Sequence, residues 1–345
     1  MRQPVRRINL ALQGGGAHGA FTWGVLDRLL DEPDVEVAAI TGTSAGALNG
    51  AAFKAGMVSG GREGARSLLD SLWRRMGAQA DMRLSAWMRA LDASHLTRFL
   101  EHMPIFAAAD MATRLVSPYA YGPFYTNPLR PVVEAFDFDC VNACSGPALF
   151  ICATCVRTGK IRVFDGPEIT TDAILASACL PTLFQAVRIR DPKSGRLEAY
   201  WDGGYTGNPA LFPLFNRDLP DDVVIVNINP LEREDLPVTP RQIQNRINEI
   251  SFNSSLLREL RAISFVQRLL EDGTLERGRM SRVLVHMIAD DALMNSLSVA
   301  TKLVPVPHVL TTLKEAGRDA ADRFLSAHKA DLGERSTVDL ARMFG

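Results

Sequence analysis

Residues 35–53 read VEVAAITGTSAGALNGAAF, and this stretch decides the fold class. The apolar run from Val35 to Thr41 is typical of a buried β-strand, and the glycine-rich turn from Gly42 to Gly46 ends it. Apolar residues then recur at the spacing of a helix that packs closely on a sheet, namely Ala47, Leu48, Ala51, Ala52 and Phe53. The stretch therefore predicts a strand, a sharp turn and a helix.

A second unit of the same kind lies directly upstream. Residues 8–12 form a short apolar run, the glycine-rich loop 14–19 follows, and apolar residues between Ala20 and Leu30 have helical spacing. Strands that alternate with helices predict an α/β fold with a mostly parallel sheet, which binds ligands at the carboxyl ends of its strands. We therefore expect the loops 14–19 and 42–46 to lie side by side.

The rest of the chain divides into three regions. Arg-, Met- and Trp-rich helical stretches between about residues 60 and 138 predict a helical cap inserted into the core, and strand-like segments return between residues 148 and 228. A charged, proline-containing stretch then precedes a long helical pattern over residues 241–271. We predict a core over residues 1–230, which includes the cap, and a mostly helical C-terminal extension over residues 231–345.

Charge and composition restrict the function classes. The 345 residues include 38 Lys and Arg against 39 Asp and Glu, which leaves no general surplus of positive charge for a nucleic-acid partner. No stretch reaches the ~18 consecutive apolar residues of a membrane span, and the basic start leads into glycines rather than into the core of a signal peptide. We therefore expect a cytoplasmic protein and leave open its peripheral contact with the inner face of the membrane.

The cysteines do not predict a metal site. Their number, five, is odd, which fits a reducing compartment better than a disulfide framework. Cys152 and Cys155 are three residues apart in a strand-like run, so their side chains point to opposite faces and do not hold one ion together. We expect no metal ion in this protein.

The turn Gly42-Thr43-Ser44-Ala45-Gly46 fits the G-x-S-x-G nucleophile elbow. In that motif a sharp strand-to-helix turn presents the serine oxygen, and small neighbours are needed because the backbones crowd. The helix N-terminus that follows favours developing negative charge. We therefore expect Ser44 to be a nucleophile, with Gly42 and Gly46 supporting the turn; the alternative is that Ser44 only caps the helix.

The loop Gly14-Gly15-Gly16-Ala17-His18-Gly19 also fits the G-x-G-x-x-G pattern of dinucleotide-binding turns. Such a site needs an acidic residue at the end of the second strand to hold the ribose, and this chain has Ile40-Thr41-Gly42 there. A loop of unhindered N–H groups at a helix N-terminus binds an oxyanion equally well. We therefore predict that the oxyanion is bound by residues of this loop, namely Gly14, Gly15, Gly16 and Ala17.

Asp202 is the candidate base for Ser44. It lies in Tyr200-Trp201-Asp202-Gly203-Gly204-Tyr205, at an expected strand end, where two glycines allow another backbone to approach closely. One alternative is that Asp202 and Gly203 form an ordinary turn. Another is a histidine triad, for which His286 has the best context, but an α/β-hydrolase has several strands before its elbow and here only two precede Ser44.

The combination resembles the patatin-like phospholipase family over roughly residues 8–230. The matching positions are Gly14, Gly16 and Gly19, then Gly42, Ser44 and Gly46, then Asp202, Gly203 and Gly204. The resemblance implies a three-layer α/β fold and a Ser-Asp dyad that works without histidine, metal or cofactor. His18 departs from the family, which commonly has Arg or Lys there, so we consider that its imidazole tunes the pH dependence of the loop.

The resemblance implies a lipid acyl hydrolase, of phospholipase A type or a related esterase, that forms an acyl ester on Ser44 and then hydrolyses it. Its substrate would be a phospholipid or another acyl ester, and a homo-oligomer is compatible with the sequence. A soluble carboxylesterase or an acyltransferase needs the same site, and a catalytically silent binding module of the same fold is the alternative outside the enzymes.

Two segments are candidates for contact with lipid. The cap contains Trp73, Trp87 and Met88, which suit insertion into an interface, and the helix over 241–271 carries Arg258 and Arg261. Apolar residues of that helix follow helical spacing and predict one buried face: Ile243, Ile247, Ile250, Leu257, Leu260 and Ile263. We expect the cap to contribute more to membrane contact than the helix.

Overall fold

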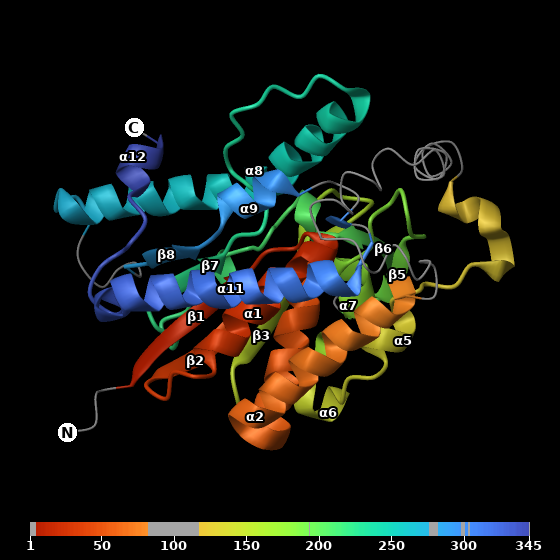
Figure 1. Ribbon diagram of the computed structural model, residues 1–345, viewed down its shortest axis with the longest axis horizontal. Coiled ribbons are helices and arrows are strands. Elements are labelled where there is room, and N and C mark those ends of the chain that lie inside the picture. Colours follow the sequence, from red (N-terminus) through yellow and green to blue (C-terminus); the bar gives the residue numbers. More distant parts are fainter. Residues whose placement is uncertain are drawn as a thin grey trace.

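The computed structural model describes residues 5–81, 117–192, 194–275, 282–297, 301–302 and 304–344 (Figure 1). Much of the expected cap, residues 82–116, lies outside the described residues, and so do Trp87 and Met88. Within the described part, no helix is both long and apolar enough to cross a membrane.

Eight strands of the described chain form one sheet, in the order β5-β6-β3-β2-β1-β7-β8, with β4 paired to β3. The four pairs that join β1, β2, β3, β7 and β8 are parallel, whereas β4, β5 and β6 form antiparallel pairs. The mostly parallel sheet is therefore confirmed. The strand bounds are β1 Arg6–Leu12, β2 Val35–Gly42, β3 Ala148–Cys155, β4 Ile161–Asp165, β5 Val187–Arg190, β6 Leu197–Asp202, β7 Asp222–Val226 and β8 Leu284–Ile288.

Helices cover both faces of this sheet (Figure 1). Along β1, Leu10 and Leu12 belong to a core shared with α1 (Gly19–Leu29), α2 (Ala45–Asp81) and α11 (Pro307–His328). Ala11, between them, belongs to a second core, which includes residues of α8 (Pro240–Glu271) and α12 (Leu340–Phe344). This alternation follows from the period of two along a strand and produces the expected three layers.

Shorter helices complete the described chain. They are α5 (Arg130–Val133), α6 (Phe138–Val141), α7 (Thr171–Ser177), α9 (Asp291–Ser296) and six 3₁₀ turns, η1 (Gly16–His18), η3 (Pro118–Phe124), η4 (Gly166–Glu168), η5 (Gly203–Tyr205), η6 (Phe212–Leu214) and η7 (Lys329–Asp331). Within α2 the backbone is non-helical at Gly60 and Gly61, where φ reaches +61° at Gly61. The helical pattern after residue 60 therefore continues α2 after a kink.

The chain beyond residue 230 is built into the same sheet. β8 pairs in parallel with β7, and the long helix expected over residues 241–271 is α8, which begins with a capping box between Thr239 and Gln242. α11 packs along α1. The domain boundary that the sequence suggests near residue 230 therefore does not coincide with a break in the sheet.

The N-terminal half of α8 differs from the expected buried face. Leu260 and Ile263 are buried, but Ile243, Ile247 and Ile250 are 43%, 53% and 55% exposed. This half of α8 turns its polar side toward a pocket instead, with Gln244, Asn245, Asn248 and Glu249. The single apolar face predicted from helical spacing is therefore wrong for the first turns, because polar side chains take the inward positions there.

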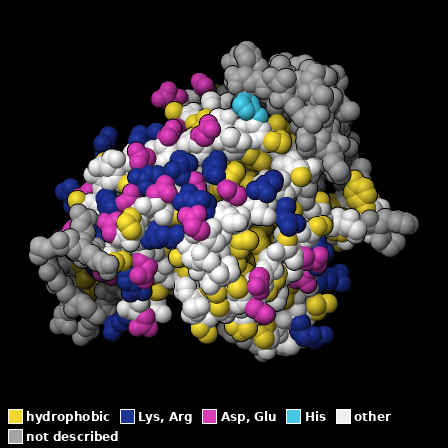
Figure 2. Space-filling view, turned by 60° about the horizontal axis from the view of Figure 1, so that its bottom comes forward, with side chains coloured by type: hydrophobic (Ala, Val, Ile, Leu, Met, Phe, Trp, Pro, Cys, Tyr) yellow, Lys and Arg dark blue, Asp and Glu magenta, His cyan; other side chains and the backbone are white. Residues whose placement is uncertain are grey.

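Charged residues are interspersed on the face of the molecule shown in Figure 2. Ion pairs join three helices of one layer: Arg66 of α2 and Arg318 of α11 both bind Asp27 of α1 and Asp31 in the turn after it, although Asp27 is only 4% exposed. The two guanidinium partners of the Asp27 carboxylate offset the energetic cost of removing its charge from water. These pairs fix α11 to the helices that follow β1 and β2.

The contact between α1 and α11 predicts a strong effect of Gly317→Ala. A Cβ at Gly317 would lie 2.0 Å from the carbonyl oxygen of Phe21, and one at Gly24 would lie 1.9 Å from that of Lys314. We expect Gly317→Ala to lower the free energy of unfolding by about 1–3 kcal/mol, because the helices must separate, although alanine favours a helix. Urea unfolding measures this change, with the exposed Asp319→Ala on the same helix as control. Equal stability of the two variants would show that the helices do not touch here.

Candidate active site

The ends of β2 and β6 lie next to each other on β3. Gly42, the last residue of β2, pairs with Ile151, and Asp202, the last residue of β6, pairs with Ala153. β4 pairs with residues 150–154 along the other edge of β3, so β2 and β6 follow one another on the remaining edge. The turn after β2 and the carboxyl group at the end of β6 are thereby brought together.

Ser44 lies in the turn between β2 and α2. Its φ is +55°, and no other non-glycine residue that the structure describes has a positive φ. Two glycines let the turn close, because a Cβ on Gly42 would lie 2.6 Å from the Gly46 carbonyl oxygen, and a Cβ on Gly46 would lie 2.1 Å from that of Leu12. The N–H of Ser44 donates to Ser177 Oγ at 2.9 Å. This strained strand-to-helix turn has the geometry of a nucleophile elbow.

The carboxyl group of Asp202 is buried beside Ser44. One oxygen, Oδ1, accepts a hydrogen bond of 2.7 Å from the Gly204 N–H, whereas Oδ2 is buried and accepts none from the described residues. Burial raises the pKa of Asp202 from 3.8 to about 7, although the Gly204 N–H and the Ser44 hydroxyl both lower it. Gly203 allows the close approach, because a Cβ there would lie 2.2 Å from the Cys152 carbonyl oxygen. Asp202 is thus poised to take up a proton near neutral pH.

The glycine loop after β1 presents free N–H groups, but not from all its residues. The Gly14 N–H donates to Asn208 Oδ1 at 2.7 Å, and the Gly14 carbonyl accepts from Asn229 Nδ2 at 2.7 Å. Gly14 therefore differs from its expected role as an oxyanion donor, because its N–H is already bound. The N–H groups of Gly15 and Gly16 donate to none of the residues that the structure describes.

A buried network of amide side chains holds this loop. Gln13 Oε1 accepts from the Ile228 and Asn229 N–H groups at 2.9 and 3.0 Å, and Gln13 Nε2 donates to Asn253 Oδ1 on α8 at 3.3 Å. The Asn208 N–H donates to Ser255 Oγ, also on α8. Sequence reasoning missed this network because its members lie up to 240 positions apart. The one signal in the sequence near it is the pair Asn208-Pro209, which follows Gly203 and Gly204.

One pocket of about 500 Å³ contains the candidate catalytic groups. Ser44 and Asp202 line it together with Gly15, Gly16 and Ala17, so five of the six predicted catalytic and oxyanion-binding residues lie at one cavity. Its walls carry large apolar side chains, among them Leu48, Trp73, Met76, Leu129, Leu183 and Phe184. The pocket therefore combines a serine, a carboxyl group and backbone donors with room for an apolar chain.

Trp73 is part of this pocket rather than of a membrane-facing surface. It is 2% exposed, and its indole N–H donates to Asn49 Oδ1 at 2.9 Å. A Cβ at Gly19 would lie 2.5 Å from the Ala45 Cβ and 3.2 Å from the Trp73 ring, which explains the glycine at that position. The expectation that Trp73 contacts a membrane is therefore wrong, because the ring packs between α1 and α2.

His18 is buried and neutral. It is 0% exposed, and its Nε2 lies 2.8 Å from Thr301 Oγ1. Burial lowers the pKa of His18 well below 6.5, and the charge of Lys302 lowers it further. The hypothesis that this imidazole sets a pH dependence near 6.5 therefore does not fit its surroundings.

His18→Arg is expected to destabilise the protein by about 3 kcal/mol or more, because it places a permanent charge in a fully buried position where Glu249 offsets the repulsion from Lys302 and Arg233 only in part. His18→Gln, which is neutral and able to bond Thr301, serves as the matched control and should cost less. Thermal and urea unfolding compare the two. A His18→Arg protein as stable as the wild type would contradict the buried, cation-flanked position of His18.

His286 does not belong to this site. It lies on β8, and its Nε2 is 2.9 Å from Asp222 Oδ1 at the start of β7. Ser44 follows the carboxyl end of β2, and β1 and β7 separate β2 from β8 in the sheet. His286 is therefore not placed to act on Ser44, because it pairs with Asp222 two strands away from β2.

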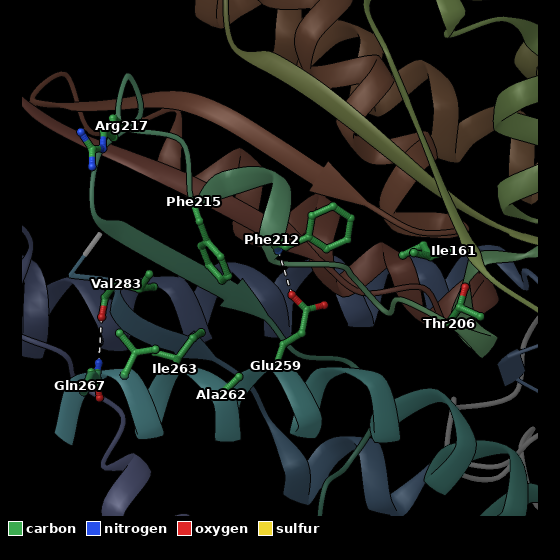
Figure 3. Close-up of a pocket in the computed structure, with 11 residues that line it drawn as sticks. Ile161, Thr206, Phe212, Phe215, Arg217, Glu259, Ala262, Ile263, Gln267 and Val283 are labelled. Atoms are coloured by element: carbon green, nitrogen blue, oxygen red, sulfur yellow. Dashed lines mark hydrogen bonds between the residues drawn. The ribbon is translucent and has the colours of Figure 1, made fainter. Parts of the chain in front are cut away.

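A second pocket, of about 630 Å³, lies along the C-terminal half of α8 and does not contain Ser44 (Figure 3). Within it, Glu259 accepts hydrogen bonds from the Leu211 and Phe212 N–H groups at 2.9 and 2.8 Å. Burial raises the pKa of Glu259 to about 7. This carboxyl group fixes the backbone of Leu211 and Phe212 to α8.

A family model described as patatin-like phospholipase matches residues 10–215, which include both Ser44 and Asp202. The chain belongs to this family. The three-layer α/β fold expected from the resemblance is accordingly confirmed. In a search of curated proteins no match is found.

Solved structures similar to this patatin-like chain include two bacterial proteins. VipD from Legionella pneumophila is 14% identical, with a TM-score of 0.40, over 94% of this chain and 67% of VipD. ExoU, in its complex with SpcU from Pseudomonas aeruginosa, is 17% identical, with a TM-score of 0.30, over 99% of this chain and 66% of the ExoU chain. This chain thus spans about two thirds of each, and the family match alone carries the assignment.

Proposed function

We propose that this protein hydrolyses acyl esters of lipids, with Ser44 as nucleophile and Asp202 as general acid and base. The family assignment supports a lipid hydrolase in general. The observation that carries the dyad is the single pocket that Ser44, Asp202 and the glycine loop line together. Its apolar walls suit an acyl chain, which a site for small polar esters would not need.

In the first half of the reaction, Ser44 Oγ attacks the ester carbonyl carbon and its proton passes to Asp202 Oδ2, the oxygen without a hydrogen-bond donor. The carbonyl oxygen becomes an oxyanion, which the N–H groups of Gly15 and Gly16 stabilise. When the ester C–O bond breaks, Asp202 returns the proton to the leaving alcohol. An acyl ester remains on Ser44.

In the second half, water attacks the acyl carbon while Asp202 accepts one of its protons. The same N–H groups stabilise the second oxyanion. Collapse breaks the bond to Ser44 Oγ, which recovers the proton from Asp202, and a free fatty acid leaves. A carboxyl group with a pKa of about 7 suits both directions of proton transfer at neutral pH.

A substrate screen tests this function. The purified wild type is offered phospholipids, diacylglycerols and short soluble esters, and the released acids are quantified. We expect release of fatty acid from lipid esters. Turnover confined to short soluble esters would indicate a carboxylesterase, and transfer of the acyl group to an added alcohol would indicate an acyltransferase. Binding of lipid without any turnover would indicate a silent binding module and overturn the proposal.

A further inference from the structure

Four charged side chains form a cluster, and two of them, Glu249 and Lys302, line the active-site pocket. Arg233, Arg246 and Lys302 approach the carboxylate of Glu249 with N–O distances of 2.7, 3.5 and 3.1 Å. The Glu249 side chain is 1% exposed, and the three cations are 21%, 22% and 15% exposed. We call these three cations, with Glu249, the basic cluster. Three positive charges meet one negative charge in a largely buried place.

The cluster borders the groups of the proposed reaction. Lys302 and Glu249 line the same pocket as Ser44. The backbone of Lys302 also lies against the glycine loop, because a Cβ at Gly16 would be 2.2 Å from the Lys302 carbonyl oxygen. A ligand group bound by Lys302 would therefore lie within the cavity that holds the scissile ester.

Hydrogen-bond donors of the cluster remain unused. The Lys302 ammonium, which has three donors, bonds Glu249 Oε1 at 3.1 Å and Asn229 Oδ1 at 3.5 Å, so one donor has no acceptor among the described residues. Arg246 Nη1 is buried and faces Glu249 Oε2 at 3.5 Å, but it makes no hydrogen bond to the described residues. Buried donors on charged groups are costly to leave unpaired, which favours a ligand with acceptor oxygens.

Glu249 is fully ionised and supplies no further negative charge. Burial raises its pKa, but Arg233 and Lys302 outweigh this effect and bring the pKa to about 2. Burial lowers the pKa of Lys302 even beside Glu249. Within the basic cluster, Glu249 is therefore the one negative charge that faces three cations.

We propose that the basic cluster binds the phosphate of a phospholipid whose acyl ester is attacked by Ser44. This inference rests on the proposed hydrolase function. A phosphate offers several anionic acceptor oxygens to Lys302, as charge-assisted hydrogen bonds require, and polar side chains of α8 line the same pocket, namely Gln244, Asn245 and Asn248. A neutral glyceride leaves the excess positive charge unbalanced, so the cluster favours phosphate-bearing lipids over diacylglycerols.

A matched pair of substrates tests this preference. Dihexanoyl phosphatidylglycerol and dihexanoylglycerol carry the same acyl esters, and both are offered as monomers so that no interface contributes. We expect the wild type to prefer the phospholipid by about tenfold or more in kcat/KM, which corresponds to ~1.4 kcal/mol. Lys302→Met should remove most of this preference, Arg246→Met should reduce it, and Lys302→Arg, which keeps the charge, should retain it.

The exposed Lys160→Met on the β3–β4 turn is the control for loss of one lysine, and should keep the wild-type preference. If Lys302→Met fails to fold, Arg246→Met still tests the cluster. The inference is overturned if wild type lacks the preference, or if neither Lys302→Met nor Arg246→Met changes it. If inorganic phosphate inhibited turnover of the glyceride as strongly as the phospholipid does, the cluster would be a site for free phosphate. That result would overturn the lipid assignment.

A binding measurement separates this inference from the hydrolase proposal. The Ser44→Ala protein is titrated with a non-hydrolysable diether phosphatidylglycerol and with the corresponding diether glycerol. We expect tighter binding of the phosphate-bearing ether, and its loss with Lys302→Met. Ser44-dependent hydrolysis of both esters with equal efficiency would contradict the phosphate-binding role of the basic cluster but not the hydrolase proposal. Preferential binding of the phosphate-bearing ether, together with no hydrolysis of either ester by the wild type, would contradict the hydrolase proposal but not the role of the basic cluster.

Discussion

Ser44→Ala is expected to lower kcat/KM for lipid esters on the order of 10³-fold or more, because it removes the atom that forms the acyl-enzyme bond. The fold should be unchanged. The substitution deletes one oxygen, the backbone N–H still bonds Ser177 Oγ, and alanine meets the same positive φ of +55° as serine. Release of fatty acid from a phospholipid, followed over time with matched protein concentrations, measures the effect.

Ser59→Ala is the matched control for Ser44→Ala. Ser59 is exposed on α2, away from the pocket, and its loss should leave both activity and unfolding unchanged. Wild-type turnover by the purified Ser44→Ala protein would end the serine-hydrolase account. A loss of activity together with a changed unfolding curve would instead show that Ser44 supports the turn.

Asp202→Asn should lower activity nearly as far as Ser44→Ala. The amide keeps the shape and the bond from the Gly204 N–H, but it accepts no proton from Ser44. Because the base must be ionised, the rate of the wild type should rise with pH through about 7, the pKa of Asp202. A pH–rate profile of the wild type and the residual rate of the variant measure both effects.

The same substitution tests the pKa of Asp202 through stability. The folded-state pKa of about 7 is above the unfolded value of 3.8, so the wild type is stabilised at low pH and loses that contribution as pH rises through about 7. The amide that Asp202→Asn introduces does not titrate. The free energy of unfolding of the variant, relative to that of the wild type, should therefore increase between pH 4 and pH 8 by up to about 4 kcal/mol. Urea unfolding at several pH values follows the difference, and a difference independent of pH would contradict the buried carboxyl group.

His286→Ala separates the dyad from a histidine triad. His286 bonds Asp222 and Thr337, so its loss should weaken folding without removing the chemistry. If His286→Ala abolished turnover while its fold persisted, and Asp202→Asn were mild, the roles that we assign to Asp202 would be wrong.

The strand-turn-helix units of residues 8–53 were predictable because local patterns define them: an apolar run, glycines and helical spacing. The sequence does not show that β6 runs antiparallel on β3, beyond the end of β2, and this pairing is what brings Asp202 to Ser44. Periodicity also misplaced Ile243, Ile247 and Ile250, because it does not reveal that the polar side of α8 faces a pocket.

The site was predictable where a short motif carries it, as for Ser44, Asp202 and the glycine loop. Side chains that act through tertiary contacts were not. Asn208 and Asn229 hold Gly14, and Lys302 reaches the pocket from far along the chain. His18 stands in a motif, yet its charge state depends on Thr301, Lys302 and burial, which only the folded chain reveals.

Covalent labelling of the nucleophile tests the central claim most directly. The protein is reacted with an alkyl fluorophosphonate, digested, and its peptides are analysed by mass spectrometry. We predict one covalent adduct, on Ser44, that forms in parallel with loss of activity, forms much more slowly in Asp202→Asn and is absent from Ser44→Ala. Inactivation with the adduct on another residue, or an adduct that forms on Ser44→Ala at the wild-type rate, would contradict the account.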